Sequence, residues 1–133
     1  MVPGRSLLKT EDPRRRLGAA GEDAAARHLE ASGHRVVARN VRAGGVELDL
    51  VVTKGRTIAF VEVKTRRSPR GGSPEEAVDA RKRARLVRGA TAFLRERGGR
   101  GRRVRFDVVS VVPDERGRLC ATHRPAAFDA GDT

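Results

Sequence analysis

The chain has 133 residues and a formal net charge of +12, with 29 lysines and arginines against 17 acidic residues. This length fits one domain with a modest core and excludes a second. No apolar run approaches the roughly 20 residues of a membrane span, and no signal peptide is apparent, so we expect a cytoplasmic protein without a membrane partner. One cysteine and three histidines exclude an internal disulfide and offer no zinc-ligand set.

The basic charge indicates a polyanionic partner, and nucleic acid is favoured because no basic amphipathic helix carries bulky apolar anchors. Base composition of the gene, together with solvation, is the alternative explanation of the arginine excess. The chain has four phenylalanines and no tryptophan or tyrosine. Because all four fall in core-like patterns, contacts to phosphates are expected rather than stacking on bases.

The first predicted element is a helix that begins after Asp12, with Pro13 in its first turn, and ends at Gly33. Its inward stripe recurs at steps of three and four residues, through Gly18, Glu22, Ala25 and Leu29. Glu22 therefore lies on or beside the face that packs against the protein. An ordinary helix carboxylate at the margin of this stripe is the alternative interpretation.

Three strands are predicted next: His34 to Arg42, Val46 to Val52 and Thr57 to Lys64. Alternation along the second strand puts Leu48, Leu50 and Val52 on one face and Glu47, Asp49 and Val51 on the other. Alternation along the third strand puts Ile58, Phe60, Glu62 and Lys64 on one face and Ala59, Val61 and Val63 on the other. Both strands are therefore acidic on one side.

A two-residue turn at Lys54-Gly55 would join the two acidic strands, because glycine accepts positive φ. This closure pairs Thr53 with Arg56, Asp49 with Phe60, and Glu47 with Glu62. It makes Asp49 and Glu62 diagonal neighbours on one face, with Cβ atoms roughly 7 Å apart. A divalent cation that binds oxygen from both side chains would fit between them.

Carboxylates this close on a half-buried sheet need a neutralising partner. Mg²⁺ is one candidate, since it binds a few carboxylates and completes its shell with water and phosphate oxygens. An ion-pair network of Lys64 with nearby arginines is the other. Only four of the 29 basic residues are lysines. Because arginine is usually the better structural ion-pair residue, Lys64 suggests that a compact ammonium is needed at this position.

The segment Arg66 to Gly72 is a loop rich in arginine and glycine, which either wraps a phosphate backbone or is simply a solvated connection. A capping box at Ser73 to Glu76 then opens a helical stretch to about Arg97, with a break allowed near Ala80. Its packing stripe is Ala77, Ala84, Leu86, Val87, Ala90, Phe93 and Leu94. The outward basic side chains are Arg81, Lys82, Arg85 and Arg88.

Val104 to Val112 is a β-branched strand, and Leu119 to His123 is a candidate short edge strand. The polar ends, 1 to about 12 and about 124 to 133, are predicted to be mobile tails of the single domain. The core elements follow the order αβββαβ, with Leu119 to His123 as a candidate last strand. This order predicts an α/β fold with a mixed sheet flanked by helices.

With these elements in place, the chain resembles the YraN-like family of small bacterial predicted nucleases, which have a restriction-endonuclease-like fold. The resemblance rests on Gly18 to Glu22, Arg39-Asn40, Glu47 to Leu50, Phe60 to Arg66, Ala77 to Asp79 with Lys82, and Arg105 to Val109. In the family pattern a glycine usually precedes the first glutamate of the Glu-x-Asp run, where this chain has Val46. The role of Glu47 is therefore open.

The resemblance implies a catalytic set of Glu22, Asp49, Glu62 and Lys64. Mg²⁺, or Mn²⁺ in its place, would be bound by Asp49, Glu62 and the main-chain carbonyl of Val63, while Lys64 would orient the attacking water. Glu22 would complete the site through a water molecule. Such a metal polarises the phosphate and lowers the pKa of the water. We expect nucleic acid, with DNA favoured, to be bound by Arg66, Arg67, Arg70, Arg81, Lys82 and Arg85.

These expectations combine into a Mg²⁺-dependent DNA endonuclease, with branched or otherwise structured DNA suggested by analogy to resolvases of this fold. The alternative is a nucleic-acid-binding module that keeps the nuclease scaffold without turnover. A homodimer is left open.

Overall fold

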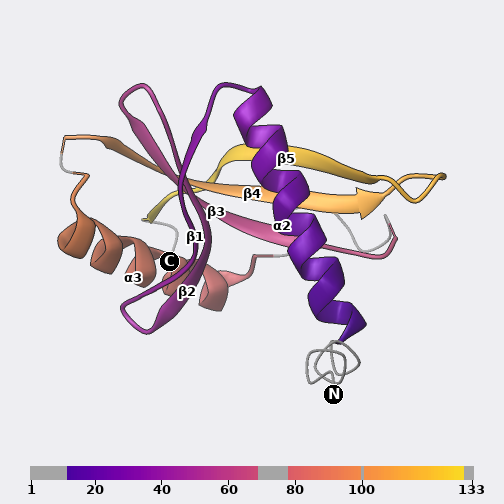
Figure 1. The fold of residues 1–133 in the computed structure, drawn as a ribbon. Helices are drawn as coiled ribbons and strands as arrows, with labels where there is room; N and C mark the ends of the chain where they lie inside the picture. The colour runs from indigo at the N-terminus through magenta and orange to yellow at the C-terminus, as the bar shows by residue number, and fades with distance from the viewer. Residues whose placement is uncertain (1–11, 69–77, 100, 131–133) are drawn as a thin grey trace, which may run out of the picture.

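The computed structural model describes residues 12–68, 78–99 and 101–130. In these ranges a five-stranded mixed sheet is flanked by helices α2 (Pro13–Ala31) and α3 (Ala80–Arg97) (Figure 1). The strands are β1 (Arg35–Ala43), β2 (Val46–Lys54), β3 (Thr57–Thr65), β4 (Arg103–Pro113) and β5 (Leu119–Phe128). The predicted α/β class and order αβββαβ are therefore confirmed. The capping box at Ser73 to Glu76 and the N-terminal tail up to residue 11 lie outside the described residues.

Local signals in the sequence determine both ends of α2. The side chain of Asp12 caps the helix by accepting from the main-chain N–H of Arg14 at 2.9 Å, and Pro13 occupies the first turn. Gly33, with φ of 92°, turns the chain into β1. Helix α3 begins at Ala80 with Asp79 as its cap, at the position where a break was predicted. Neither helix, nor any other helix in the described ranges, is long and apolar enough to cross a membrane.

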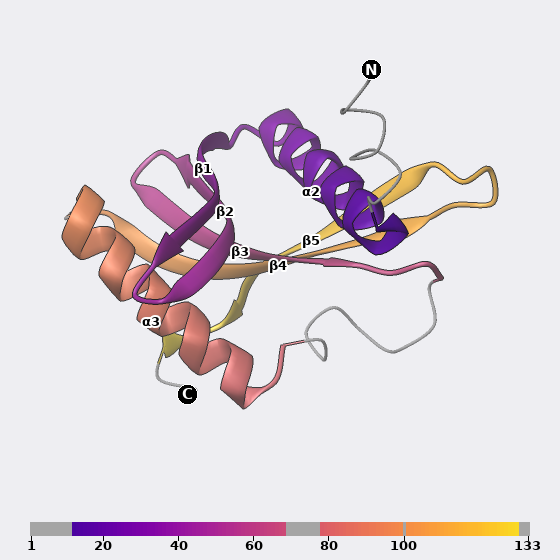
Figure 2. The ribbon, with the colours of Figure 1, turned by 60° about the horizontal axis from the view of Figure 1, so that its bottom comes forward.

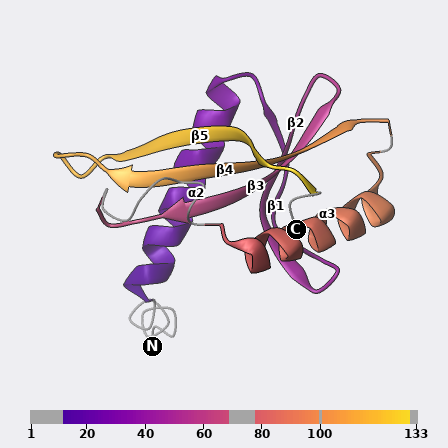
Figure 3. The same cartoon turned by 180° about the vertical axis from the view of Figure 1, so that it is seen from behind.

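The sheet has strand order β1-β2-β3-β4-β5, and all neighbours are antiparallel except the parallel pair β3–β4. Parallel neighbours need a crossover connection, and the chain segment that contains α3 supplies it. Helices α2 and α3 cover opposite faces of the sheet, as the front and back views show (Figures 1 and 3). The β4–β5 hairpin extends beyond the body of the molecule (Figure 2).

Each helix seals its own hydrophobic cluster against the sheet. Below α3 the four phenylalanines are buried together, with Phe60 against Phe93 and Phe106, and Phe106 stacked on Phe128. Below α2 the cluster is built from small and β-branched residues, around Leu29 and Leu50. The predicted stripe of α3 is buried or half-buried at Leu86, Val87, Ala90, Phe93 and Leu94, whereas Ala84 is exposed and was assigned wrongly. Ala77 lies outside the described residues.

The β2–β3 turn differs from its prediction by one residue. Lys54 pairs with Thr57, so the two turn residues are Gly55 and Arg56, with Gly55 at φ of 58° in the first position as a type II′ turn requires. This moves the whole register by two residues, and Val51 rather than Asp49 lies opposite Phe60. A shift of two preserves the faces of the strands. The predicted diagonal relation of Asp49 and Glu62 was therefore wrong, but their shared side of the hairpin was not.

The alternation of β2 is interrupted at Asp49. Leu48 packs in the cluster below α3 together with Val51, whereas Leu50 and Val52 pack in the cluster below α2. The prediction that Leu48 and Leu50 share a face was therefore wrong. The irregularity coincides with a left-handed residue, Asn40, at φ of 49° on the neighbouring strand. By contrast, β3 alternates as predicted, with Ile58 and Phe60 below α3 and Ala59 and Val61 below α2.

Strand β5 is longer than predicted, since residues 124–128, assigned to the C-terminal tail, form its second half. The cause is a buried carboxylate on β4. Asp107 is fully buried and accepts hydrogen bonds from Arg105, from His123 Nε2 at 2.7 Å and from the main-chain N–H of Ala126 at 3.0 Å. These bonds hold β5 past Pro125 and place Phe128 in the core.

Candidate active site

The two carboxylates predicted to form the site lie side by side in the structure. Asp49 is on β2 and Glu62 on β3, each one residue beyond the Leu50–Val61 pair with which the β2–β3 ladder ends. Asp49 Oδ2 accepts from the main-chain N–H of Val63 at 2.9 Å, which fixes the Asp49 side chain against β3. Both side chains line a pocket of about 160 Å³ together with Glu47. Glu47, whose role the sequence left open, is thus a neighbour of the pair.

Burial and mutual repulsion oppose ionisation of this pair. Burial, followed by the charges of Glu62, Glu22 and Glu47, raises the pKa of Asp49 to about 7, against the hydrogen bond from Val63, which lowers it. Burial likewise raises the pKa of Glu62. A carboxyl whose charge is this unfavourable indicates a site prepared for a positive ligand.

Two basic residues of α3 face the carboxylates across the same pocket. Lys82 and Arg85 line it near the beginning of the helix, with Leu86 closing the apolar side. After burial, Lys82 has the largest influence on Glu62 and acts to lower its pKa, followed by Lys64 and Arg85. Lys64 is half-buried on β3, two residues beyond Glu62. The sequence predicted Lys82 as an outward basic residue, but the crossover of α3 brings it to the acidic strands.

Glu22 approaches the site from α2. The helix lies directly against the end of β3 because Gly21 has no side chain, and a Cβ there would collide with Thr65. Glu22 is half-buried and accepts from Asn40 Nδ2 at 2.9 Å. The charge of Glu22 raises the pKa of both Asp49 and Glu62. Sequence reasoning placed Glu22 here but gave Asn40 no role, because a left-handed residue inside a strand leaves no periodic signal.

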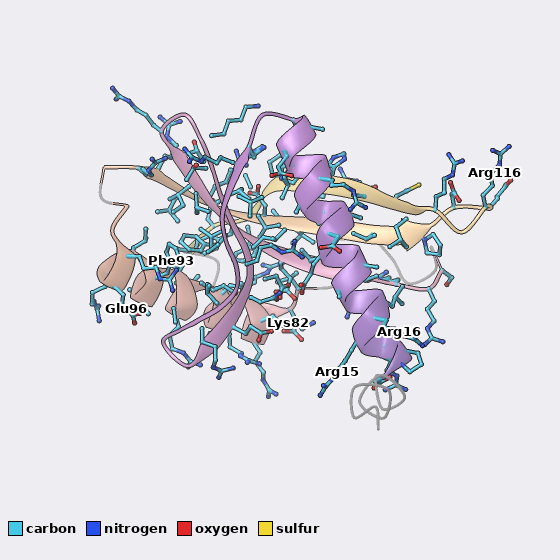
Figure 4. The ribbon with its side chains drawn as sticks, viewed as in Figure 1. Arg15, Arg16, Lys82, Phe93, Glu96 and Arg116 are labelled. Atoms are coloured by element: carbon cyan, nitrogen blue, oxygen red, sulfur yellow. The ribbon has the colours of Figure 1, made fainter. Side chains whose placement is uncertain are left out.

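The arginines predicted to bind nucleic acid are more dispersed. Arg66 and Arg67 follow β3, and Arg67 lines a separate open hollow of about 710 Å³ with Arg116 of the β4–β5 hairpin. Arg81 is exposed on α3, and Arg70 lies outside the described residues. Figure 4 shows Lys82 at the beginning of α3, and Arg116 at the hairpin tip. The predicted set is thus divided between the acidic pocket and a second surface.

The oxygen donors of this pocket suit a hard divalent cation that takes only a few of its ligands from the protein. Within the described ranges, no three or more His, Cys, Asp or Glu side chains lie close enough to hold a metal ion. A divalent ion would therefore rely on Asp49, Glu62, the main-chain carbonyl of Val63, and oxygens of water or phosphate. Mg²⁺ is commonly bound in this way, with one or two carboxylates and substrate phosphates.

Comparison with known sequences assigns the chain to a family. The model of the uncharacterised protein family UPF0102 matches residues 21–111, which include all of these pocket residues. This chain belongs to the UPF0102 family. The UPF0102 protein of Symbiobacterium thermophilum is 52% identical over 116 residues, covering 87% of this chain and 98% of the relative. That of Myxococcus xanthus is 45% identical over 119 residues, covering 89% and 93%. The predicted membership of the YraN-like family, another name for UPF0102, is confirmed.

Among solved structures, this UPF0102 chain is similar to SfsA of Pyrococcus furiosus, determined in complex with Ca²⁺, at 18% identity and a TM-score of 0.40. The match covers 81% of this chain and 62% of SfsA, so the chain spans less than two thirds of that protein.

Proposed function

We propose that this UPF0102 protein is a Mg²⁺-dependent endonuclease of restriction-endonuclease-like architecture that hydrolyses phosphodiester bonds, with DNA as the favoured substrate. The observation that supports it is the Asp49–Glu62 pair, two half-buried carboxylates with raised pKa values that share a pocket with Lys82 and Arg85. Anionic side chains on one wall suit a divalent cation, and cationic side chains on the other suit a phosphate. One pocket that receives both meets the needs of phosphodiester hydrolysis.

Each residue then has a defined task. Asp49, Glu62 and the Val63 carbonyl would hold Mg²⁺ or Mn²⁺, which when bound polarises the phosphate and lowers the pKa of a water. Lys64, a compact ammonium beside Glu62, would orient the attacking water and offset its charge. Lys82 and Arg85 would hold the phosphate of the substrate against the carboxylates.

The distribution of basic residues supports a nucleic-acid substrate. Neither helix has an acidic residue in its first turn, and α2 begins with Pro13 followed by three arginines, of which Arg15 and Arg16 are labelled in Figure 4. Positive charge at a helix N-terminus opposes the helix dipole, so these arginines are unfavourable for the helix alone. All four phenylalanines lie in the core and are not exposed for stacking on bases. The arginines would therefore bind the phosphates of the nucleic acid. This favours recognition of shape, such as branched DNA, over recognition of sequence.

A non-catalytic nucleic-acid-binding module is the second candidate. It is favoured by one observation: Lys82, Lys64 and Arg85 all act to lower the pKa of Glu62, so part of the acidic charge is already balanced without metal. In that case Lys64 would be a structural ion-pair residue, and no metal would be needed.

A cleavage screen separates the two functions. Single-stranded, duplex, flap and four-way DNA and RNA would be incubated with the protein in Mg²⁺, Mn²⁺ or EDTA. We expect metal-dependent cleavage of at least one DNA substrate, lost in Lys64→Ala with binding retained. Binding without cleavage of any substrate would establish the module instead. Cleavage by Lys64→Ala at the parent rate would contradict the catalytic role assigned to Lys64.

A further inference from the structure

Asn40 has a backbone conformation that its strand does not explain. Its φ of 49° lies in the left-handed region, which within the described residues only Ala126 shares among residues other than glycine. Asn40 is exposed, so core packing does not impose the conformation. Asparagine tolerates this region better than most residues but is still strained there. Strain of this kind concentrates at functional sites.

The position of Asn40 relates it to the acidic pocket. Its neighbours Arg39 and Val41 pair with Leu50 and Leu48 on β2, which places Asn40 level with Asp49. The side chain of Asn40 does not bond to β2 but reaches α2, where Nδ2 donates to Glu22 Oε1 at 2.9 Å. Asn40 therefore links the strand beside Asp49 to the third carboxylate near the pocket.

The adjacent residue provides a comparison. Arg39 binds the carboxylate next along α2, with Nη2 2.7 Å from Asp23 Oδ1, and both side chains are about half exposed. The Asn40–Glu22 and Arg39–Asp23 bonds attach α2 to β1 in the same place. Of the two carboxylates, however, only Glu22 also raises the pKa of Asp49 and Glu62. Attachment of the helix would thus be achieved by Arg39 and Asp23 alone, without a left-handed asparagine.

Glu22 would not remain beside two other carboxylates without restraint. Its side chain has three rotatable bonds, and repulsion favours rotamers that point to solvent. The single amide hydrogen bond opposes this rotation and occupies only Oε1, which leaves Oε2 to accept from water. We propose that Asn40 is a positioning residue, whose amide holds Glu22 toward Asp49 and Glu62 so that Glu22 binds a water in the shell of a divalent ion. This inference rests on the metal site of the proposed function.

Asn40→Gly is the discriminating variant. Glycine adopts the left-handed region without strain, so the path of β1 is kept while the amide is removed. Arg39→Ala is the matched control, because it removes the neighbouring attachment of α2 and leaves the Glu22 bond intact. Thermal denaturation of both variants establishes that they fold.

The measurement is the effect of bound Mn²⁺ on the carboxyl carbon of Glu22, observed by carbon-detected NMR, because paramagnetic broadening reports the distance to the ion independently of catalysis. We expect strong broadening in the parent and in Arg39→Ala, and clearly weaker broadening in Asn40→Gly. Single-turnover cleavage by Asn40→Gly should fall by about a hundredfold, as displacements of about an ångström in an active site can cause. DNA affinity should be unchanged.

Three outcomes are distinguishable. Weakened broadening in Asn40→Gly alone supports the positioning role, even where no cleavable substrate has been found. Equal broadening in Asn40→Gly and the parent overturns the role of Asn40 and leaves the metal site standing. Absence of Mn²⁺ binding to the parent overturns the metal site and the inference that rests on it.

Discussion

Replacing Asp49 by asparagine should stabilise the metal-free protein, in contrast to most substitutions of partly buried residues. Burial and the carboxylate of Glu62 raise the pKa of Asp49 from 3.8 to about 7. The folded chain therefore holds a proton between about pH 4 and 7 that the unfolded chain releases, and stability falls as pH rises through this window. Asparagine removes the charge but can still accept from the main-chain N–H of Val63.

The magnitude follows from the same values. A difference of about three pKa units between folded and unfolded chain corresponds to roughly 4 kcal/mol above pH 7. Because Asp49 is partly open to solvent and Glu62 shares the repulsion, we expect Asp49→Asn to raise the free energy of unfolding by about 2 kcal/mol at pH 8. The gain should shrink toward zero near pH 4, where Asp49 of the parent is protonated and therefore as neutral as the asparagine of the variant.

Urea denaturation in EDTA at pH 4.5, 6 and 8 measures this difference. Asp23→Asn is the control, since Asp23 is an exposed carboxylate paired with Arg39, and its loss should change stability by less than about 1 kcal/mol at any pH. An Asp49→Asn variant that is less stable than the parent at pH 8, or a difference that does not vary with pH, would show that the charge of Asp49 does not destabilise the fold. Either result would indicate a structural ion-pair network.

Three further predictions concern catalysis, binding and the fold. Lys64→Arg keeps the charge but misplaces its donors, so single-turnover cleavage should fall about a hundredfold with DNA binding unchanged; equal rates would exclude a catalytic role. Joint replacement of Arg66, Arg67 and Arg70 by alanine should reduce the salt dependence of duplex binding by about two to three phosphate contacts, and an unchanged slope would exclude this segment from the interface. Asp107→Ala leaves Arg105 and His123 without their buried acceptor, so urea denaturation should show a loss of at least about 3 kcal/mol; a smaller loss would mean that the buried network contributes little.

Local chemistry made much of the fold predictable. The cap at Asp12, the first-turn Pro13 and the alternation of β3 all act within a few residues, and the structure agrees with each. The extent of β5 was not predictable, because distant residues determine it. Pro125 and the residues around it resemble a tail, but hydrogen bonds donated to Asp107, far back in the sequence, extend β5 through them.

For the candidate site, composition and the short turn between two acidic strands were sufficient to predict that Asp49 and Glu62 lie together, although the register was wrong by two residues and the alternation of β2 is interrupted at Asp49. They could not place Lys82 in the same pocket, because that depends on how α3 crosses the sheet. Nor could they assign Asn40, whose role comes from a left-handed backbone and a partner on another element.

Calorimetric titration of the protein with Mn²⁺ at pH 8 tests the central claim most directly, because it asks whether Asp49 and Glu62 form one metal site regardless of substrate. We expect a single site in the parent that either Asp49→Asn or Glu62→Gln abolishes, and that Asp23→Asn retains. Binding should be weaker at pH 6, since the proton held by Asp49 must then be displaced. Parent-like binding by both Asp49→Asn and Glu62→Gln would show that these two carboxylates do not form the metal site.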